Sequence, residues 1–167
     1  SSDSPRIGPT TSGSSLTVKK IVTAFLSYRG RILLLRRSSQ VGSYRGRWAG
    51  ISGYIEHNEV PLERALKEIS EEVGLGDGNI SLVRMGQALP AFDKDIDTLF
   101  LVHPFLFATE HPKITLDWEH DDFRWVRRED LRRFETVPKL KEALDRVLDD
   151  TSIIHTLHPT VLNELRE

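Results

Sequence analysis

The pattern of hydrophobic positions along the chain predicts mostly β-structure, interrupted by two amphipathic helices. Strands are expected where β-branched and aromatic residues gather between turn residues, at 16–28, 31–37, 48–55, 79–92, 98–107 and 122–126. The dipeptide Arg29-Gly30 between the first two runs indicates a hairpin turn. The run at 98–107 is apolar nearly throughout, which predicts burial on both faces, and Pro104 inside it predicts a bend or an edge position.

Residues 61–73 form the clearest predicted helix. Its apolar residues share one face at helical spacing, namely Leu62, Ala65, Leu66, Ile69 and Val73. Pro61 suits a first helical turn, where no N–H is needed, and Gly74 and Gly76 are typical of a helix end. A second amphipathic helix is expected at 137–148, after a helical turn at 129–134.

Composition and charge narrow the classes of protein that fit these elements. The chain has 167 residues, of which 38% are hydrophobic and 29% charged, and this balance suits one soluble globular domain. Its formal net charge of -2 provides no overall positive field for nucleic acid. The absence of cysteine excludes disulfides and zinc–cysteine sites, and no apolar run reaches the ~18 residues of a membrane helix.

The two ends of the chain differ from its centre. Residues 1–15 are rich in serine, proline and glycine and lack the apolar stretch of a secretory signal, so we expect a flexible tail there. Residues 151–167 hold too many apolar side chains for a solvated tail, and we expect a C-terminal extension or the start of a linker or second domain. A chain without cysteine, signal peptide or membrane helix is expected in the cytoplasm.

The polar side of the helix predicted at 61–73 carries the candidate chemistry. Glu68, Glu71 and Glu72 fall within a stripe of about 100° on the helix circumference, with Arg64 close by. Three neighbouring carboxylates repel one another unless a cation lies among them, and a hard ion such as Mg²⁺ prefers oxygen ligands. Such an ion polarises a phosphoryl oxygen and acidifies a bound water, which is the chemistry of anhydride cleavage. A solvated acidic face is the alternative interpretation of the stripe taken alone.

Residues 53–75, GYIEHNEVPLERALKEISEEVGL, resemble the Nudix box, whose pattern is G-x5-E-x7-R-E-U-x-E-E-x-G-U with U aliphatic. The matching positions are Gly53, Glu59, Glu68, Ile69, Glu71, Glu72, Gly74 and Leu75. A chance match of the fixed residue types is on the order of 10⁻⁷ per start point. The pattern departs at Lys67, where the family has an arginine thought to hold a box glutamate, and lysine lacks the bidentate fork of arginine.

The resemblance implies an α/β fold, a Nudix-type α/β/α sandwich with a mixed β-sheet, in which residues 16–150 form the Nudix hydrolase domain. It assigns binding of Mg²⁺ or Mn²⁺ to three carboxylates and one backbone carbonyl, namely those of Glu68, Glu71, Glu72 and Gly53. Glu56 stands where relatives often have a glutamate, and it is expected either to join a second metal or to cap the helix entrance. Glu59 is expected to be structural, pairing with Lys67 or a backbone N–H.

The general base has several candidates under this resemblance. Glu71 or Glu72 would serve from the helix, whereas in other relatives a glutamate on a later loop takes the role. Glu119, within the segment DWEHDD, is the best match for that loop glutamate, and His120 is the second choice. A loop that is merely solvated is the alternative.

Substrate contacts are expected from arginines near the cleft entrance and from one tryptophan. Arginine binds phosphate through its planar donor fork. Of the four arginines at 36, 37, 45 and 47, at most two are expected to touch substrate, and Arg37 and Arg45 are preferred. Trp118 lies in a polar loop and is the candidate for stacking on a base, whereas Trp48 and Trp125 are expected in the core.

The implied reaction is metal-dependent hydrolysis of a phosphoanhydride bond in a nucleoside-diphosphate-linked small molecule. Pro90 stands near a proline found in Nudix enzymes that act on ADP-ribose, so an ADP-ribose-like substrate is one expectation. The alternative is a non-catalytic Nudix domain that senses a ligand or serves as an interaction module of a larger protein. Such domains usually lose box carboxylates, which this chain keeps. Neither a membrane nor nucleic acid is expected as a partner, and the sequence leaves the oligomeric state open.

Overall fold

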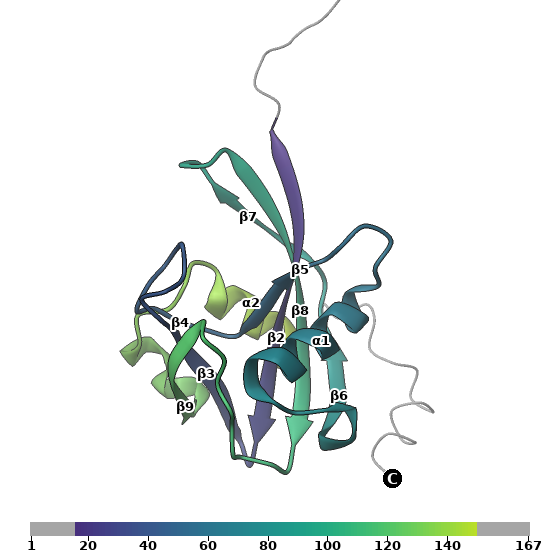
Figure 1. The fold of residues 1–167 in the computed structure, drawn as a ribbon, viewed down its shortest axis with the longest axis vertical. Coiled ribbons are helices and arrows are strands. Elements are labelled where there is room, and N and C mark those ends of the chain that lie inside the picture. Colours follow the sequence, from purple (N-terminus) through teal and green to yellow (C-terminus); the bar gives the residue numbers. More distant parts are fainter. Residues whose placement is uncertain (1–15, 150–167) are drawn as a thin grey trace, which may run out of the picture.

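The computed structural model describes residues 16–149 and shows a mixed β-sheet with an α-helix against each of its faces (Figure 1). The strands of this part are β2 (Thr17–Tyr28), β3 (Arg31–Arg37), β4 (Trp48–Ala49), β5 (Ile51–Tyr54), β6 (Ile80–Met85), β7 (Leu89–Asp93), β8 (Thr98–Thr109) and β9 (His120–Val126). The helices are α1 (Pro61–Val73) and α2 (Leu140–Leu148), with two short 3-10 helices, η1 (Asp77–Asn79) and η2 (Arg128–Arg133). This arrangement confirms the predicted α/β fold, a sandwich around a mixed sheet.

The centre of the sheet is a long parallel pair, β2 beside β8, aligned from Thr17 opposite Thr98 to Ser27 opposite Ala108. On its other side, β2 pairs with β5 through its middle and with β3 at its end, where the predicted hairpin forms. β6 and β7 both pair with β8, while β4 and β9 pair with β3. The sheet is therefore antiparallel at its edges and parallel at its centre.

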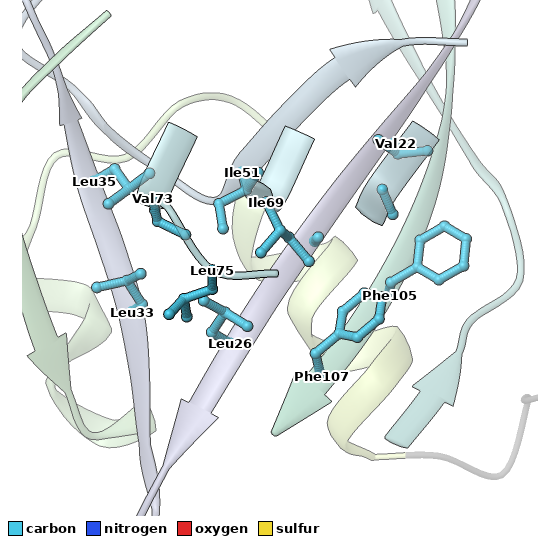
Figure 2. Packing of buried hydrophobic residues seen from close by; sticks show 12 residues of the cluster. Val22, Leu26, Leu33, Leu35, Ile51, Ile69, Val73, Leu75, Phe105 and Phe107 are labelled. Carbon is cyan, nitrogen blue, oxygen red and sulfur yellow. The ribbon is translucent and has the colours of Figure 1, made fainter. Parts of the chain in front are cut away.

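The side chains of β2 alternate between two apolar cores, one on each face of the sheet. Val22, Ala24 and Leu26 belong to the core beneath α1, whereas Phe25 belongs to the core beneath α2. Figure 2 shows the core on the α1 side, where Ile69 of the helix lies among the strand residues. Because successive strand residues point to opposite faces, a strand covered on both faces needs an unbroken apolar run.

Helix α1 has the bounds that its apolar period predicts, Pro61–Val73. Pro61 lies in the first turn, where its missing N–H costs little. Gly74 follows the last turn in the left-handed conformation, with a φ of 76°, and its N–H donates to the Ser70 carbonyl. Proline and glycine therefore fix both ends of the helix that carries the carboxylate stripe.

Helix α2 begins at Leu140, later than the predicted residue 137. The carbonyl of Trp48 accepts the Val137 N–H at 2.9 Å, and Trp48 also forms a β-bridge with Thr136. Lys139 then takes a left-handed φ of 68° before the helix begins. A contact with a strand far away in the sequence thus overrides the apolar periodicity of this segment.

Strand β8 lies inside the sheet, so the edge position considered for Pro104 is wrong. The strand predicted at 79–92 is in fact two strands, β6 and β7, which pair with β8 on either side of Pro104. Between them, the Pro104 carbonyl accepts the Gly86 N–H at 2.9 Å. A residue that cannot donate a backbone hydrogen bond therefore fits at the gap between two partner strands.

The flexible tail predicted at 1–15 and the extension predicted at 151–167 lie outside the described residues. Within residues 16–149, no helix is both long and apolar enough to cross a membrane. Helices α1 and α2 have 13 and 9 residues, fewer than the ~20 that a membrane-spanning helix needs.

Candidate active site

Helix α1 brings its acidic stripe onto strand β5. Gly53 pairs with Val22, on the face of the sheet that α1 covers, and the Glu68 carboxyl group lies against Gly53. A Cβ atom at residue 53 would overlap that carboxyl group, so only glycine leaves room for it. The structure therefore brings together two of the residues predicted to bind metal, Gly53 and Glu68.

Glu72 lies one helical turn beyond Glu68 and is buried, with 2% of its surface exposed. Its Oε2 atom has no hydrogen-bond partner among the described residues. Burial, followed by the neighbouring Glu68 carboxyl group, raises the pKa of Glu72 well above its ordinary value, and the charges of Asp117 and Glu119 add to this effect. A buried carboxyl group in these surroundings requires either a proton or a cation beside it.

The loop that precedes β9 supplies the other half of the site. One donor atom from each of Glu72, Glu119 and His120 lies within 4.8 Å of the others, a spacing that suits a metal ion. Ser38, just after β3, fixes this loop, because its N–H donates to the Glu119 carbonyl at 2.8 Å and its hydroxyl to the Trp118 carbonyl at 2.9 Å. Both loop candidates for the general base, Glu119 and His120, therefore lie beside the helix.

His120 is buried and links the loop to the helix. Its Nδ1 atom lies 3.0 Å from Asp117 Oδ1, and its Nε2 atom lies 3.7 Å from Glu72 Oε1. Asp117 thereby holds the imidazole ring toward the helix glutamate. Burial and the charge of Asp117 raise the pKa of the Glu119 carboxyl group, while His120 and Arg37 act in the opposite direction.

A network of opposite charges surrounds the beginning of the helix. Glu59 accepts a hydrogen bond from the Lys67 ammonium group at 3.1 Å and another from the Glu56 N–H at 2.9 Å, the two pairings predicted for it. It also accepts Arg64 Nε at 2.8 Å, while Arg64 Nη1 donates to Glu68 at 2.9 Å. The hydrogen bonds from Arg64 and from the Glu56 N–H, with a smaller effect of Lys67, lower the pKa of Glu59 to about 2.

The remaining predicted acidic residues lie outside the cluster of Glu72, Glu119 and His120. Glu71 is exposed on α1, and the Glu56 side chain is 70% exposed in the loop before the helix. Neither belongs to a compact group of metal-ligating side chains in the described part of the chain. Their predicted roles as ligands stay predictions.

The predicted substrate contacts are spread around the same loop. Arg37, at the end of β3, pairs in register with His120, and its Nε donates to the Ser43 carbonyl at 2.9 Å. Arg45 is exposed and donates to the Val41 carbonyl at 2.7 Å, and Trp118 is 65% exposed. The other two tryptophans, at 48 and 125, are partly buried and pack against the two cores, as predicted.

Two residues of the site had no assigned role in the sequence prediction, Asp117 and Arg64. The sequence holds a signal for each of them. Asp117 stands three residues before His120 in the same acidic segment, and Arg64 precedes Glu68 by four residues on a helix, where side chains meet. What the sequence does not show is that the loop folds back onto the helix.

This fold and site define a class of protein: an α/β/α sandwich in which one helix carries a stripe of carboxylates over a strand glycine. A family model described as the NUDIX domain matches residues 19–148. The chain therefore belongs to the Nudix family of hydrolases. It is similar to a nucleoside triphosphatase, NudI, from Klebsiella pneumoniae subsp. pneumoniae, with 27% identity over 128 residues that cover 70% of this chain and 87% of the relative.

Solved structures support the same fold. The MutT protein from Methanosarcina mazei Go1 superposes with a TM-score of 0.65 at 22% identity, over 81% of this chain and 96% of that one. An Ap4A hydrolase from C. elegans, solved as a binary complex, superposes with a TM-score of 0.60 at 18% identity, over 78% of this chain and 93% of that one. At these identities the similarity shows the fold alone.

Proposed function

We propose that this chain hydrolyses a phosphoanhydride bond in a nucleoside-diphosphate-linked small molecule, and that it uses Mg²⁺ or Mn²⁺ bound at α1. The observation that carries the proposal is the buried Glu72 carboxyl group, whose Oε2 atom has no partner in the described chain although Glu119 and His120 lie beside it. This group lies on the helix that matches the Nudix box, within the matched family domain.

The donor set fits a hard divalent cation. Glu68 and Glu72 would bind it together with the Gly53 carbonyl, because Glu68 already lies against Gly53. Glu71 would complete the set by resemblance to the family, and Glu56, exposed at the helix entrance, would join a second ion. When bound, such an ion neutralises the stripe, polarises a phosphoryl oxygen and acidifies a water molecule.

The chain's own residues then have separate tasks. Glu119 accepts a proton from the attacking water at a carboxylate oxygen, a role that its raised pKa favours by bringing it closer to neutral pH. His120, held by Asp117, keeps the buried Glu72 side chain in place. Arg37, whose charge reaches Glu119, binds a substrate phosphate group through its guanidinium fork.

Recognition of the nucleoside falls to the exposed surface near this loop. Trp118 precedes Glu119 directly and exposes 65% of its surface, so its ring offers a stacking platform for a base. Arg45, exposed in the loop between β3 and β4, adds a second positive charge for phosphate. The similarity to a nucleoside triphosphatase supports a nucleoside triphosphate, and Pro90, exposed on β7, supports an ADP-ribose-like molecule.

A substrate panel tests the proposal. The purified chain is incubated with nucleoside triphosphates, ADP-ribose, dinucleoside polyphosphates and nucleotide sugars, each with Mg²⁺, with Mn²⁺ and with EDTA. We expect cleavage of at least one class that stops in EDTA and in Glu72→Gln. Metal-independent cleavage, or a chain that neither cleaves any of these molecules nor binds Mn²⁺ in calorimetry, would overturn the proposal.

Replacing Gly53 by alanine is expected to lower kcat/KM by about 10- to 100-fold, as for other changes that displace a metal-binding group. The added methyl group overlaps the Glu68 carboxyl group and its Cγ atom, so the Glu68 side chain must shift and its hydrogen bond from Arg64 is disturbed. The measurement compares kcat/KM and Tm with those of wild type. Gly42→Ala, where a Cβ meets open space, is the matched control. Equal activity in G53A and G42A would contradict the role of Gly53.

A further inference from the structure

Arg64 lies at the centre of the network of charges at the beginning of α1 and bonds to two of its glutamates, Glu59 and Glu68. Its side chain is only 14% exposed. Nε donates to Glu59 at 2.8 Å and Nη1 donates to Glu68 at 2.9 Å, while Nη2 lies 3.9 Å from Glu56. One guanidinium group therefore bridges the loop before α1 to the carboxylate that lies over β5.

Lys67 stands where the Nudix box has its arginine, yet its contacts are poorer. Its ammonium group reaches Glu59 at 3.1 Å, its side chain is 60% exposed, and no ion pair with Glu68 is found in the described part of the chain. Lysine carries one compact charge, which is already bonded to Glu59, so it lacks the fork with which an arginine at 67 would hold two carboxylates at once. Residue 64, one turn earlier, lies on the same side as Glu68.

We propose that Arg64 takes over in this chain the positioning task that the Nudix box gives to residue 67: it holds Glu68 over Gly53 in the orientation that binds metal. Lys67 keeps only the smaller task of neutralising Glu59. The inference rests on the proposed function, since it treats Glu68 as a metal ligand.

The geometry favours arginine for this task. Its planar group donates two hydrogen bonds in fixed directions, whereas lysine offers one compact charge on a flexible stem. Glu59 is itself fixed by the Glu56 N–H at 2.9 Å, so the sequence of contacts from Glu59 through Arg64 to Glu68 begins at the backbone. A Glu68 side chain anchored in this way resists the repulsion of Glu72 before a cation arrives.

Titration calorimetry of the metal-free chain with Mn²⁺ tests the inference without any substrate. Three variants are compared with wild type: R64A, K67A and the double variant R64A/K67R. R64A is expected to weaken Mn²⁺ binding by about 10- to 100-fold, the usual effect of removing a group that orients a ligand. K67A, the matched control, is expected to stay within about threefold, because Lys67 is exposed and, among residues 16–149, is bonded to Glu59 alone.

The double variant tests the exchange of tasks. R64A/K67R restores the residue type of the Nudix box at 67. We therefore expect it to bind Mn²⁺ at least about fivefold more tightly than R64A, which recovers part of the affinity lost with the orienting group. Thermal melts in EDTA confirm that each variant is folded. The inference is overturned if folded R64A binds Mn²⁺ as tightly as wild type does, or if K67A loses as much Mn²⁺ affinity as R64A. It is also overturned if the double variant R64A/K67R binds Mn²⁺ no more tightly than R64A. If wild type itself does not bind Mn²⁺, the proposed function fails together with the inference. If wild type binds Mn²⁺ and one of the three results above is found, only the inference fails.

Discussion

Replacing Glu72 by glutamine is expected to lower kcat/KM by about 10²–10³-fold, the scale of losing one preorganised electrostatic group at a reacting phosphate. The same change is expected to raise the Tm of the metal-free protein. Glu72 is 2% exposed and its Oε2 atom lacks a partner among the described residues, so its ionised form is unfavourable without a cation. Glutamine keeps the shape of the side chain and removes the charge.

The pH dependence gives this prediction its sign. Burial raises the pKa of Glu72 in the folded chain well above the ordinary 4.5. The folded state therefore favours the protonated Glu72 side chain. This contribution to the free energy of unfolding is fully present below the pKa of the unfolded chain and is lost as the pH rises through the pKa of the folded chain. Metal-free wild type therefore loses stability between acidic and neutral pH. E72Q has no carboxyl group at this position, so it does not lose the contribution of Glu72.

Thermal melts in EDTA at a series of pH values measure the effect. Each kcal/mol gained corresponds to roughly 2–4 °C in Tm for a chain of this size. Glu63→Gln, an exposed glutamate in the first turn of the same helix, is the control and is expected to change neither activity nor pH dependence. An E72Q protein that melts below wild type in EDTA at pH 7 would contradict the argument.

The elements that could be predicted from sequence are those whose signals are local. The bounds of α1 follow from the spacing of its apolar residues together with Pro61 and Gly74, and β3 follows from an uninterrupted apolar run between arginines. The carboxylate stripe follows from the same helical geometry. The resemblance to the Nudix box then predicted the sandwich and the family, both of which are confirmed.

The elements that sequence patterns misplaced depend on contacts between distant segments. Helix α2 begins late because the Trp48 carbonyl accepts the Val137 N–H. Pro104 can lie within a central strand because the pairing partner of β8 changes from β6 to β7 at this residue. In the site, Ser38 ties the loop with Glu119 to the end of β3. No local period records such contacts, so the pairing of that loop with α1 required the structure.

Replacing Glu119 by glutamine is expected to lower kcat by about 10²–10⁴-fold, the usual contribution of a general base. Its carboxyl group lies beside Glu72 and His120, and burial with the charge of Asp117 raises its pKa. Glutamine retains the side-chain shape and the backbone bond to Ser38 but cannot accept a proton from water. We therefore expect the Mn²⁺ affinity, measured by calorimetry, to stay within about tenfold of wild type, since the helix carboxylates remain in place.

The separation of kcat from metal affinity distinguishes a base from a ligand. E72Q is expected to lose both quantities, whereas E119Q is expected to lose mainly kcat. Asp121→Asn is the matched control, because Asp121 lies two residues further along, is exposed, and pairs with Arg36 at 2.7 Å away from the cluster. As a surface change it is expected to alter kcat by no more than about twofold. If E119Q lost metal affinity as strongly as E72Q, Glu119 would be a ligand, and the proton would have to pass to another group of the site, with His120 the nearest.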